Sequence, residues 1–393
     1  MLDGFDVSLA AHAATHYGRT GENGIDAVAK SPYSGLPSNC FWSSGVADEH
    51  PLTIADLYAK RFAIDRKTRI AAAGSCFAQH ISRNLRDRGC AVLDVEPAPS
   101  GLSQRERDRR GYGVYSARYA NIYTAAQLLQ LIKEAFGKQA PTDRVWEKNG
   151  RYYDAQRPGV EPEGFATEDE VLAHREHHLL KVRRLLRNTD LLVFTFGLTE
   201  AWTTADGATV FPTCPGTLAG SFDAGRYVFK NYLHDEVLKD FIGVRTILKA
   251  INPQMKFLIT VSPVPLVATA SDIHVLQATT YSKSVLRAVC GALYQQYADV
   301  DYFPSYELIA SPFSRSFFFK KDLREVSEAG VDAAMRMFFR QHANLDGSDG
   351  AAVPEASGHR RLSAAKKMGL DKRGGGGSKK VVCEEEMLMA FNK

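Results

Sequence analysis

The stretch that decides the fold is RIAAAGSCFAQHISRNLRDRG, residues 69–89. A short apolar run ends at Gly74, and this composition is typical of a buried strand over 68–74. Apolar residues four apart then predict a helix over 77–89 with a glycine at its end. A second short apolar run at 91–97 predicts another strand, so the stretch forms a β-α-β unit and implies a parallel sheet.

The same alternation of strands and helices continues along the chain. Further strands are predicted at 190–197 and 256–264, and a strand followed by a turn at 299–309. Helices are predicted at 51–62, after an N-cap at Thr124, and at 168–189, 234–253, 278–297 and 322–342. Residues 98–120 predict a polar loop, 137–168 predict a long loop or a small insertion, and 203–232 are rich in loops. The pattern predicts an open α/β three-layer sandwich with four or five mostly parallel strands.

Composition shifts divide the chain into four parts. Residues 1–50 predict an N-terminal arm or lid, and 51–342 predict the main α/β domain. Residues 343–378, which end in GGGGS, predict a flexible linker, and 379–393 predict a C-terminal segment that docks on the body.

Composition excludes several classes of function. The net charge of +4 over 393 residues is too small to indicate a protein that binds nucleic acid. We find no apolar run long enough to span a membrane and no signal peptide, so a cytoplasmic protein is expected. The six cysteines lie far apart without a CxxC pair, which predicts neither a metal site nor a disulfide framework.

Chemically useful residues follow the predicted strands, and the carboxyl ends of parallel strands collect at one edge of a sheet. Gly74, Ser75 and Cys76 stand where the first strand turns into a helix. Backbone N–H groups at a helix start favour a reactive thiolate at Cys76 and can hold an oxyanion. The alternative is that Ser75 caps the helix and Cys76 is a small packing residue.

AGSCFAQHI at 73–81 resembles the block that gives the GSCFA family its name, a distant relative of the SGNH/GDSL hydrolases. Four further blocks are similar to that family in the same order, and the resemblance covers roughly residues 40–340: FTFGLTEAW (194–202), PTCPGTLAG (212–220), TVSPVPLVATASDIHVLQATTYSKSVLRA (260–288) and DYFPSYELI (301–309). It implies a flavodoxin-like α/β/α sandwich and ester hydrolysis or acyl transfer, often on carbohydrates.

The SGNH pattern also implies roles for single residues. Its nucleophile stands two residues after a glycine, which implies Cys76 as the nucleophile and Ser75 in the place of the family's aspartate. Gly197 and Thr199 match the oxyanion block, with Thr199 replacing an asparagine. Asn121 is a candidate for a second oxyanion donor.

The general base is where this chain departs from the pattern. The relatives' Asp-x-x-His corresponds to Asp322 through Glu325, so a glutamate replaces the histidine. Glu325 would serve as the base only if burial raised its pKa. His274, past a strand end, and His80, one turn after Cys76, are the other candidates, with His274 favoured.

Other residues at this edge are candidates for substrate contacts. Glu200 would orient a base or bind substrate, or be a solvated carboxylate, and Trp202 would be a sugar platform or a packed edge. Beside Ser282, Lys283 would hold a phosphate or carboxylate, or point to water. The Arg- and Tyr-rich loop 107–124 would cover a glycan or nucleotide-sugar.

The leading prediction is a bacterial SGNH-like acyl esterase or O-acyltransferase acting on a carbohydrate, in surface-polysaccharide synthesis. No cofactor is expected, although acetyl-CoA or another acyl donor would serve a transfer reaction. The second hypothesis is a non-catalytic module that binds a glycan or nucleotide-sugar. The third is a peptide-modifying enzyme whose own tail, tethered through residues 374–378, is the substrate.

Overall fold

A computed structural model describes residues 31–54, 56–342, 345 and 384–392. The chain divides into two compact units, 1–48 and 49–393. In the first unit, a 3₁₀ helix spans Ser38–Cys40 and a π-helical turn spans Ser43–Ala47. The predicted linker, apart from Leu345, and residues 379–383 and 393 of the predicted C-terminal segment lie outside the described residues.

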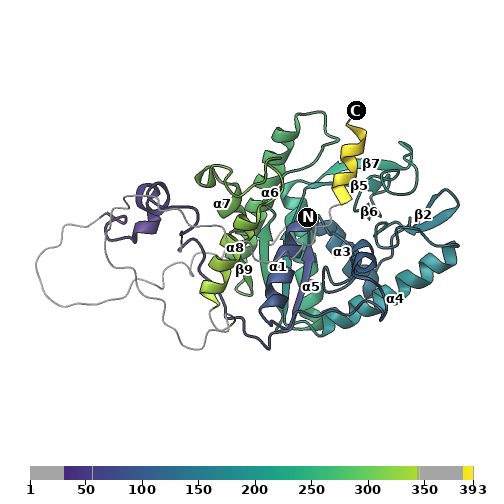
Figure 1. The fold of residues 1–393 in the computed structure, drawn as a ribbon, viewed down its shortest axis with the longest axis horizontal. Coiled ribbons are helices and arrows are strands. Elements are labelled where there is room, and N and C mark those ends of the chain that lie inside the picture. Colours follow the sequence, from purple (N-terminus) through teal and green to yellow (C-terminus); the bar gives the residue numbers. More distant parts are fainter. Residues whose placement is uncertain (1–30, 55, 343–344, 346–383, 393) are drawn as a thin grey trace, which may run out of the picture. The chain divides into compact units, whose positions relative to one another are not determined.

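The second unit contains the strands and helices of the fold (Figure 1). Its strands are β1 (Ile70–Gly74), β2 (Val145–Lys148), β3 (Arg151–Asp154), β4 (Leu191–Phe196), β5 (Glu200–Thr204), β6 (Val210–Phe211), β7 (Tyr227–Asn231), β8 (Lys256–Val261) and β9 (Val300–Tyr302). Its α-helices are α1 (Cys76–Asp87), α2 (Gln104–Arg109), α3 (Ala125–Ala135), α4 (Glu168–Arg187), α5 (His234–Ile251), α6 (Val275–Gln296), α7 (Ser305–Ala310) and α8 (Glu328–Gln341). Short 3₁₀ helices span Pro312–Ser314 and Glu384–Phe391.

The central sheet has four strands in the order β1-β4-β8-β9, and every pair is parallel. The predicted strand at 91–97 is reduced to one parallel bridge, between Val92 and Ile70, on the outer side of β1. Counting that bridge, the strands follow the order 2-1-3-4-5 of flavodoxin-like sheets. This order confirms the predicted fold class and places the topological switch point between β1 and β4.

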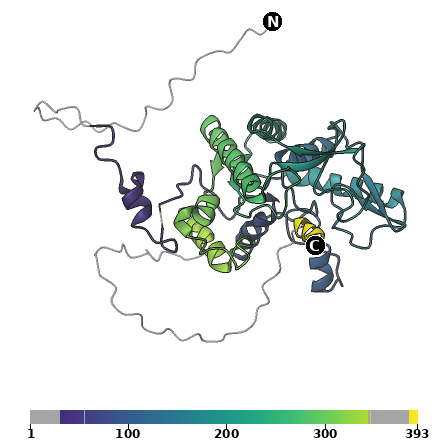
Figure 2. The same ribbon diagram turned by 90° about the horizontal axis from the view of Figure 1, so that it is seen from above.

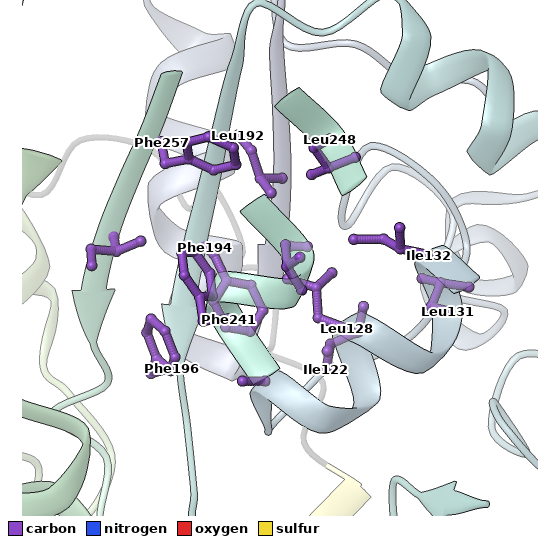
Figure 3. Packing of buried hydrophobic residues seen from close by; sticks show 14 of the residues in the cluster. Ile122, Leu128, Leu131, Ile132, Leu192, Phe194, Phe196, Phe241, Leu248 and Phe257 are labelled. Carbon is purple, nitrogen blue, oxygen red and sulfur yellow. The ribbon is translucent and has the colours of Figure 1, made fainter. Parts of the chain in front are cut away.

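Side chains on both faces of the sheet are buried, which makes the fold three layers deep. One face packs against α3, α4, α5 and α6, and Figure 3 shows phenylalanines of β4 and β8 meeting leucines and an isoleucine of α3 and Phe241 of α5. The other face packs against α1 and α8. Strands that are apolar on both faces are typical of parallel sheets, and this explains the continuous apolar runs in the sequence.

Two predicted loops contain strands. The segment 137–168 holds the antiparallel hairpin β2-β3, and 203–232 holds most of a small antiparallel sheet in the order β6-β5-β7. These strands are short, and their many polar or half-exposed residues conceal them among the surrounding glycines and prolines. The segment 137–168 is thus a small insertion, which was one of its two predicted alternatives. The loop-rich segment 203–232 and the predicted loop 98–120 contain strands and the short α2, respectively, that the sequence pattern did not indicate.

Two predicted helices also differ from the structure. The described residues of 51–62 form turns and bends, because the hydroxyl of Tyr58 and the backbone N–H of Arg61 both donate to Asp301 and fix an irregular path. The last helix begins at Glu328 and not near residue 322, because the Asp322 carboxylate accepts from the following backbone N–H groups and closes a turn.

Candidate active site

A glycine places the Ser75-Cys76 pair at the carboxyl edge of the sheet. Gly74 has a φ of 136°, and a Cβ at this position would lie 2.5 Å from the carbonyl oxygen of Thr195 on β4. The same oxygen accepts from the backbone N–H of Ser75 at 3.1 Å. The turn from β1 into α1 therefore lies directly against the neighbouring strand, at the switch point.

Cys76 is the first residue of α1 and is 6% exposed. The first-turn N–H groups of an α-helix have no acceptor within the helix and carry its positive dipole end. Burial raises the pKa of the Tyr115 hydroxyl and Cys76 adds to that rise, whereas Cys76 opposes the lowering of the Lys283 pKa by burial. The thiol thus lies among backbone donors, a phenol and an ammonium group.

Ser75 occupies the N-cap position of α1, but its hydroxyl makes no capping hydrogen bond. The side chain is 2% exposed, and its Oγ has no hydrogen-bond partner within the described part of the chain. Its Cβ packs against Gly197, where an added Cβ would be only 2.8 Å away. The predicted capping role is absent, and Ser75 instead leaves a hydroxyl beside Cys76.

Asn121 has its side-chain amide fixed in orientation. Its Oδ1 accepts from Gln79 of α1 at 3.1 Å and from the hydroxyl of Tyr115, which also lies 3.0 Å from the carbonyl oxygen of Ser75. With the oxygen engaged in this way, the Nδ2 donors face the opposite direction, where they meet the carboxylate of Glu384. The predicted oxyanion donor therefore belongs to the buried network around Ser75.

The loop after β4 is held by the backbone carbonyl of Tyr123 and by Ser282 of α6. The backbone N–H groups of Gly197 and Leu198 donate to the carbonyl of Tyr123, and that of Thr199 donates to Ser282 Oγ at 3.0 Å. The N–H of Gly197 is thus already engaged. The Thr199 hydroxyl is buried and has no hydrogen-bond partner among the described residues.

Lys283 does not point to water: it is 2% exposed, and its Nζ donates to the carbonyl oxygen of Gly197 at 2.7 Å. Burial lowers its pKa to about 8, while Glu385 and Cys76 act in the opposite direction. An amine with this pKa exchanges a proton near neutral pH, as a general acid or base must.

The bases predicted from the sequence have other contacts. His274 is exposed, and its Nδ1 accepts from the backbone N–H of Leu276 as the N-cap of α6. Glu325 is paired with Lys320 at 2.5 Å, and burial lowers the pKa of His80 to about 4.

Next to Glu325, the side chain of Arg324 makes a contact at the candidate active site. It lies 3.6 Å from Glu385, and its Nε donates to the carbonyl of Pro265. Asp322 is exposed and accepts from backbone N–H groups of its own turn.

A cavity of about 410 Å³ adjoins this edge of the sheet. Glu200 lines it, accepts from Thr269 Oγ1 at 2.7 Å, and has its pKa raised by burial. Trp202 lines it too, in edge contact with Phe222 and Phe229. The tryptophan is therefore both packed at an edge and available to a ligand.

Sequence reasoning missed several residues of this region: Tyr115, Tyr123, Arg324 and Glu384. The two tyrosines belong to the Arg- and Tyr-rich loop, and alternation of apolar and polar residues there was the available signal. Within the described ranges we find no cluster of residues able to hold a metal ion, and no helix long and apolar enough to cross a membrane.

The fold and this edge define a flavodoxin-like α/β protein with a cysteine at the switch point. The family model "GSCFA family" matches residues 69–338, and the chain belongs to this family. No curated protein matches the chain.

Solved structures share weak similarity with the chain. A carbohydrate esterase family 3 from Talaromyces cellulolyticus has 14% identity and a TM-score of 0.26, covering 58% of this chain and 93% of its own. An acetyl esterase mutant with acetate ion gives the same values. A family 3 carbohydrate esterase from Clostridium thermocellum has 11% identity and a TM-score of 0.21, covering 55% and 83%.

Proposed function

We propose that the protein is an acyl esterase or O-acyltransferase that acts on a carbohydrate ester through Cys76. The observation that carries this proposal is the position of the thiol: it begins α1 at the switch point of the sheet, and it acts electrostatically on the buried Lys283 amine. A nucleophile, a group that exchanges protons and the N–H donors of a helix start are the parts that acyl transfer needs.

The first half-reaction begins when the Cys76 thiol gives its proton to the neutral amine of Lys283. The thiolate sulfur attacks the acyl carbon, and the carbonyl electrons move to an oxyanion that first-turn N–H groups of α1 stabilise. Collapse breaks the C–O bond, and the leaving alkoxide takes the proton from the Lys283 ammonium. The products are a thioester and a free alcohol.

The second half-reaction regenerates the thiolate. Water or a sugar hydroxyl gives its proton to the Lys283 amine and attacks the thioester carbon, and the C–S bond then breaks. With water the product is a carboxylic acid, and with a sugar hydroxyl it is a new ester. In the transfer reaction acetyl-CoA or another acyl donor would load the thiol.

The neighbouring cavity suits the carbohydrate part of such a substrate. Trp202 offers an aromatic face, and the carboxyl of Glu200 offers hydrogen bonds. We place the reaction in the cytoplasmic synthesis of bacterial surface polysaccharide, on the family resemblance alone. The Arg- and Tyr-rich loop 107–124 would cover a nucleotide-sugar, which is a substrate of the kind that such a synthesis uses.

The test is to replace the thiol. Cys76→Ala should lower the hydrolysis of p-nitrophenyl acetate by at least about 10³-fold, because a nucleophile acts only through its bond to the acyl group. Cys40→Ala, an exposed cysteine of the first unit, is the matched control and should keep full activity. Incubation of the parent protein with acetyl-CoA or the acetate ester should add an acetyl mass to the peptide that contains Cys76.

If Cys76→Ala keeps the parent rate, or if the parent protein neither turns over esters nor gains the acyl mass, the proposal is wrong. In the latter case the protein is a binding module that resembles an enzyme.

A further inference from the structure

The C-terminal segment Glu384–Phe391 contacts residues of the candidate active site. In Figure 1 this segment (yellow) lies at the end of the sheet beside β5, and in Figure 2, seen from above, it overlies the middle of the body. Glu384 is 8% exposed, and its Oε2 accepts from the Asn121 amide and, at 3.0 Å, from the hydroxyl of Tyr123. A carboxylate is therefore buried against the predicted oxyanion donor.

The next glutamates lie near cationic groups. Glu385 lies 3.6 Å from Arg324, and Glu386 lies 3.9 Å from Arg324. Burial lowers the pKa of Lys283, and Glu385 opposes that lowering. Burying a carboxylate is costly unless such donors and charges compensate it.

Two apolar residues of the segment line the neighbouring cavity. Leu388 and Phe391 line it together with Trp202, Phe222 and Phe229. The segment thus combines carboxylates at the polar end of the site with apolar side chains in the cavity, which is how an amphipathic ligand would bind.

The groups that receive the carboxylates belong to the body of the protein. Asn121, Tyr123, Lys283 and Arg324 all lie within the residues that match the family, whereas the segment lies beyond them. The fixed amide of Asn121 aims its donors at this place through Gln79 and Tyr115. The hydrogen-bond donors therefore belong to the part of the chain that matches the family. The segment Glu384–Phe391 is one ligand that these donors bind.

We propose that Asn121 and Tyr123 form a subsite for a carboxylate of the substrate, and that Glu384 occupies this subsite as an intramolecular competitor. The substrate class is then an anionic one, such as the ester of an acidic sugar. This inference rests on the proposed function, because it takes Cys76 as the reacting group.

The test compares two alkylating reagents of similar size that differ in charge, iodoacetate and neutral iodoacetamide. The rate at which each modifies Cys76 in the full chain is followed by mass spectrometry of its peptide. Glu384→Ala should open the subsite, so the ratio of the iodoacetate rate to the iodoacetamide rate should rise about tenfold over the parent protein. Glu176→Ala, an exposed glutamate on α4, should leave the ratio unchanged.

Removing a negative charge alone would favour an anionic reagent, so a variant of equal charge is needed. Adding Tyr123→Phe to Glu384→Ala deletes one donor without changing charge, and it should reverse most of the gain. Tyr123→Phe alone should speed the neutral reagent, because Glu384 is held less firmly; this arm stays informative if the alanine variant fails to fold.

An unchanged ratio in Glu384→Ala, or a gain that persists in full in the double variant, overturns the carboxylate subsite. Neither result depends on ester turnover. The proposed function is contradicted by a different measurement, which is an unchanged rate of ester hydrolysis in Cys76→Ala. The two failures are therefore distinguishable.

Discussion

At the scale of single residues, the candidate site depends on a lysine that the body of the protein encloses. Lys283 reaches from α6 to the carbonyl of Gly197 and lies near Cys76. The sequence placed this lysine at the correct edge of the sheet but left its orientation open. Orientation depends on the packing of α6 against the loop after β4, and residue type alone carries no information about that packing.

The enclosed lysine makes stability depend on alkaline pH. Burial lowers the pKa of Lys283 from 10.5 to about 8, so between these values the unfolded chain holds more protons than the folded one. The contribution of this group to the free energy of unfolding therefore rises as the pH increases through that window. Relative to Lys283→Met, the parent protein should gain up to about 3 kcal/mol between pH 7 and pH 10.5.

Urea unfolding of both proteins at several pH values measures this difference. Lys239→Met, an exposed lysine on α5, is the control and should show no such trend. A parent-to-variant difference that stays constant from pH 7 to pH 10.5 would contradict an enclosed amine.

At the scale of elements, periodicity predicts the buried sheet well and the small strands poorly. The strands β1, β4 and β8 are apolar on both faces, so tertiary packing and local pattern agree. The strands β5 and β7 pair in a small sheet whose residues are only partly buried. Their stability comes from cross-strand partners that lie far away in sequence. Such partners cannot be inferred from a local window.

The hairpin β2-β3 is fixed to the helices by a buried ionic network. Arg175 of α4 donates to Glu134 of α3 at 2.8 Å and to Asp154 of β3 at 3.0 Å, and all three side chains are almost fully buried. Arg175→Met leaves two buried carboxylates without this partner and should cost about 3–5 kcal/mol of unfolding free energy.

Thermal or urea unfolding measures the loss at this network. Arg184→Met, an exposed arginine of the same helix, should change stability by less than about 0.5 kcal/mol. A loss in Arg175→Met no larger than in this control would show that the network does not hold the hairpin.

At the scale of the whole molecule, the sequence predicted where a site forms but not what covers it. The ends of neighbouring parallel strands lie at one edge of the sheet, so the contact of Ser75 with Gly197 follows from the fold. Contact between Asn121 and Glu384 spans 263 positions of sequence and depends on side-chain directions. The replacement of the expected histidine by Glu325 was visible, but the inward position of Arg324 depends on the turn closed by Asp322.

Enclosed histidines should make the whole molecule sensitive to acid. Burial lowers the pKa of His80, His174, His178 and His342 from 6.5 to about 4. Below pH 6.5 the unfolded chain binds more protons at these histidines than the folded chain does. The free energy of unfolding therefore falls as the pH drops from 6.5 to about 4. Each histidine contributes up to about 1.4 kcal/mol per pH unit in that window.

Urea unfolding between pH 7 and pH 4.5 should show a smaller slope of unfolding free energy against pH in His342→Gln than in the parent protein, even though this variant loses packing against Phe338. His234→Gln, with a side chain 40% exposed, should keep the parent slope, and equal slopes in all three proteins would contradict this origin of acid sensitivity.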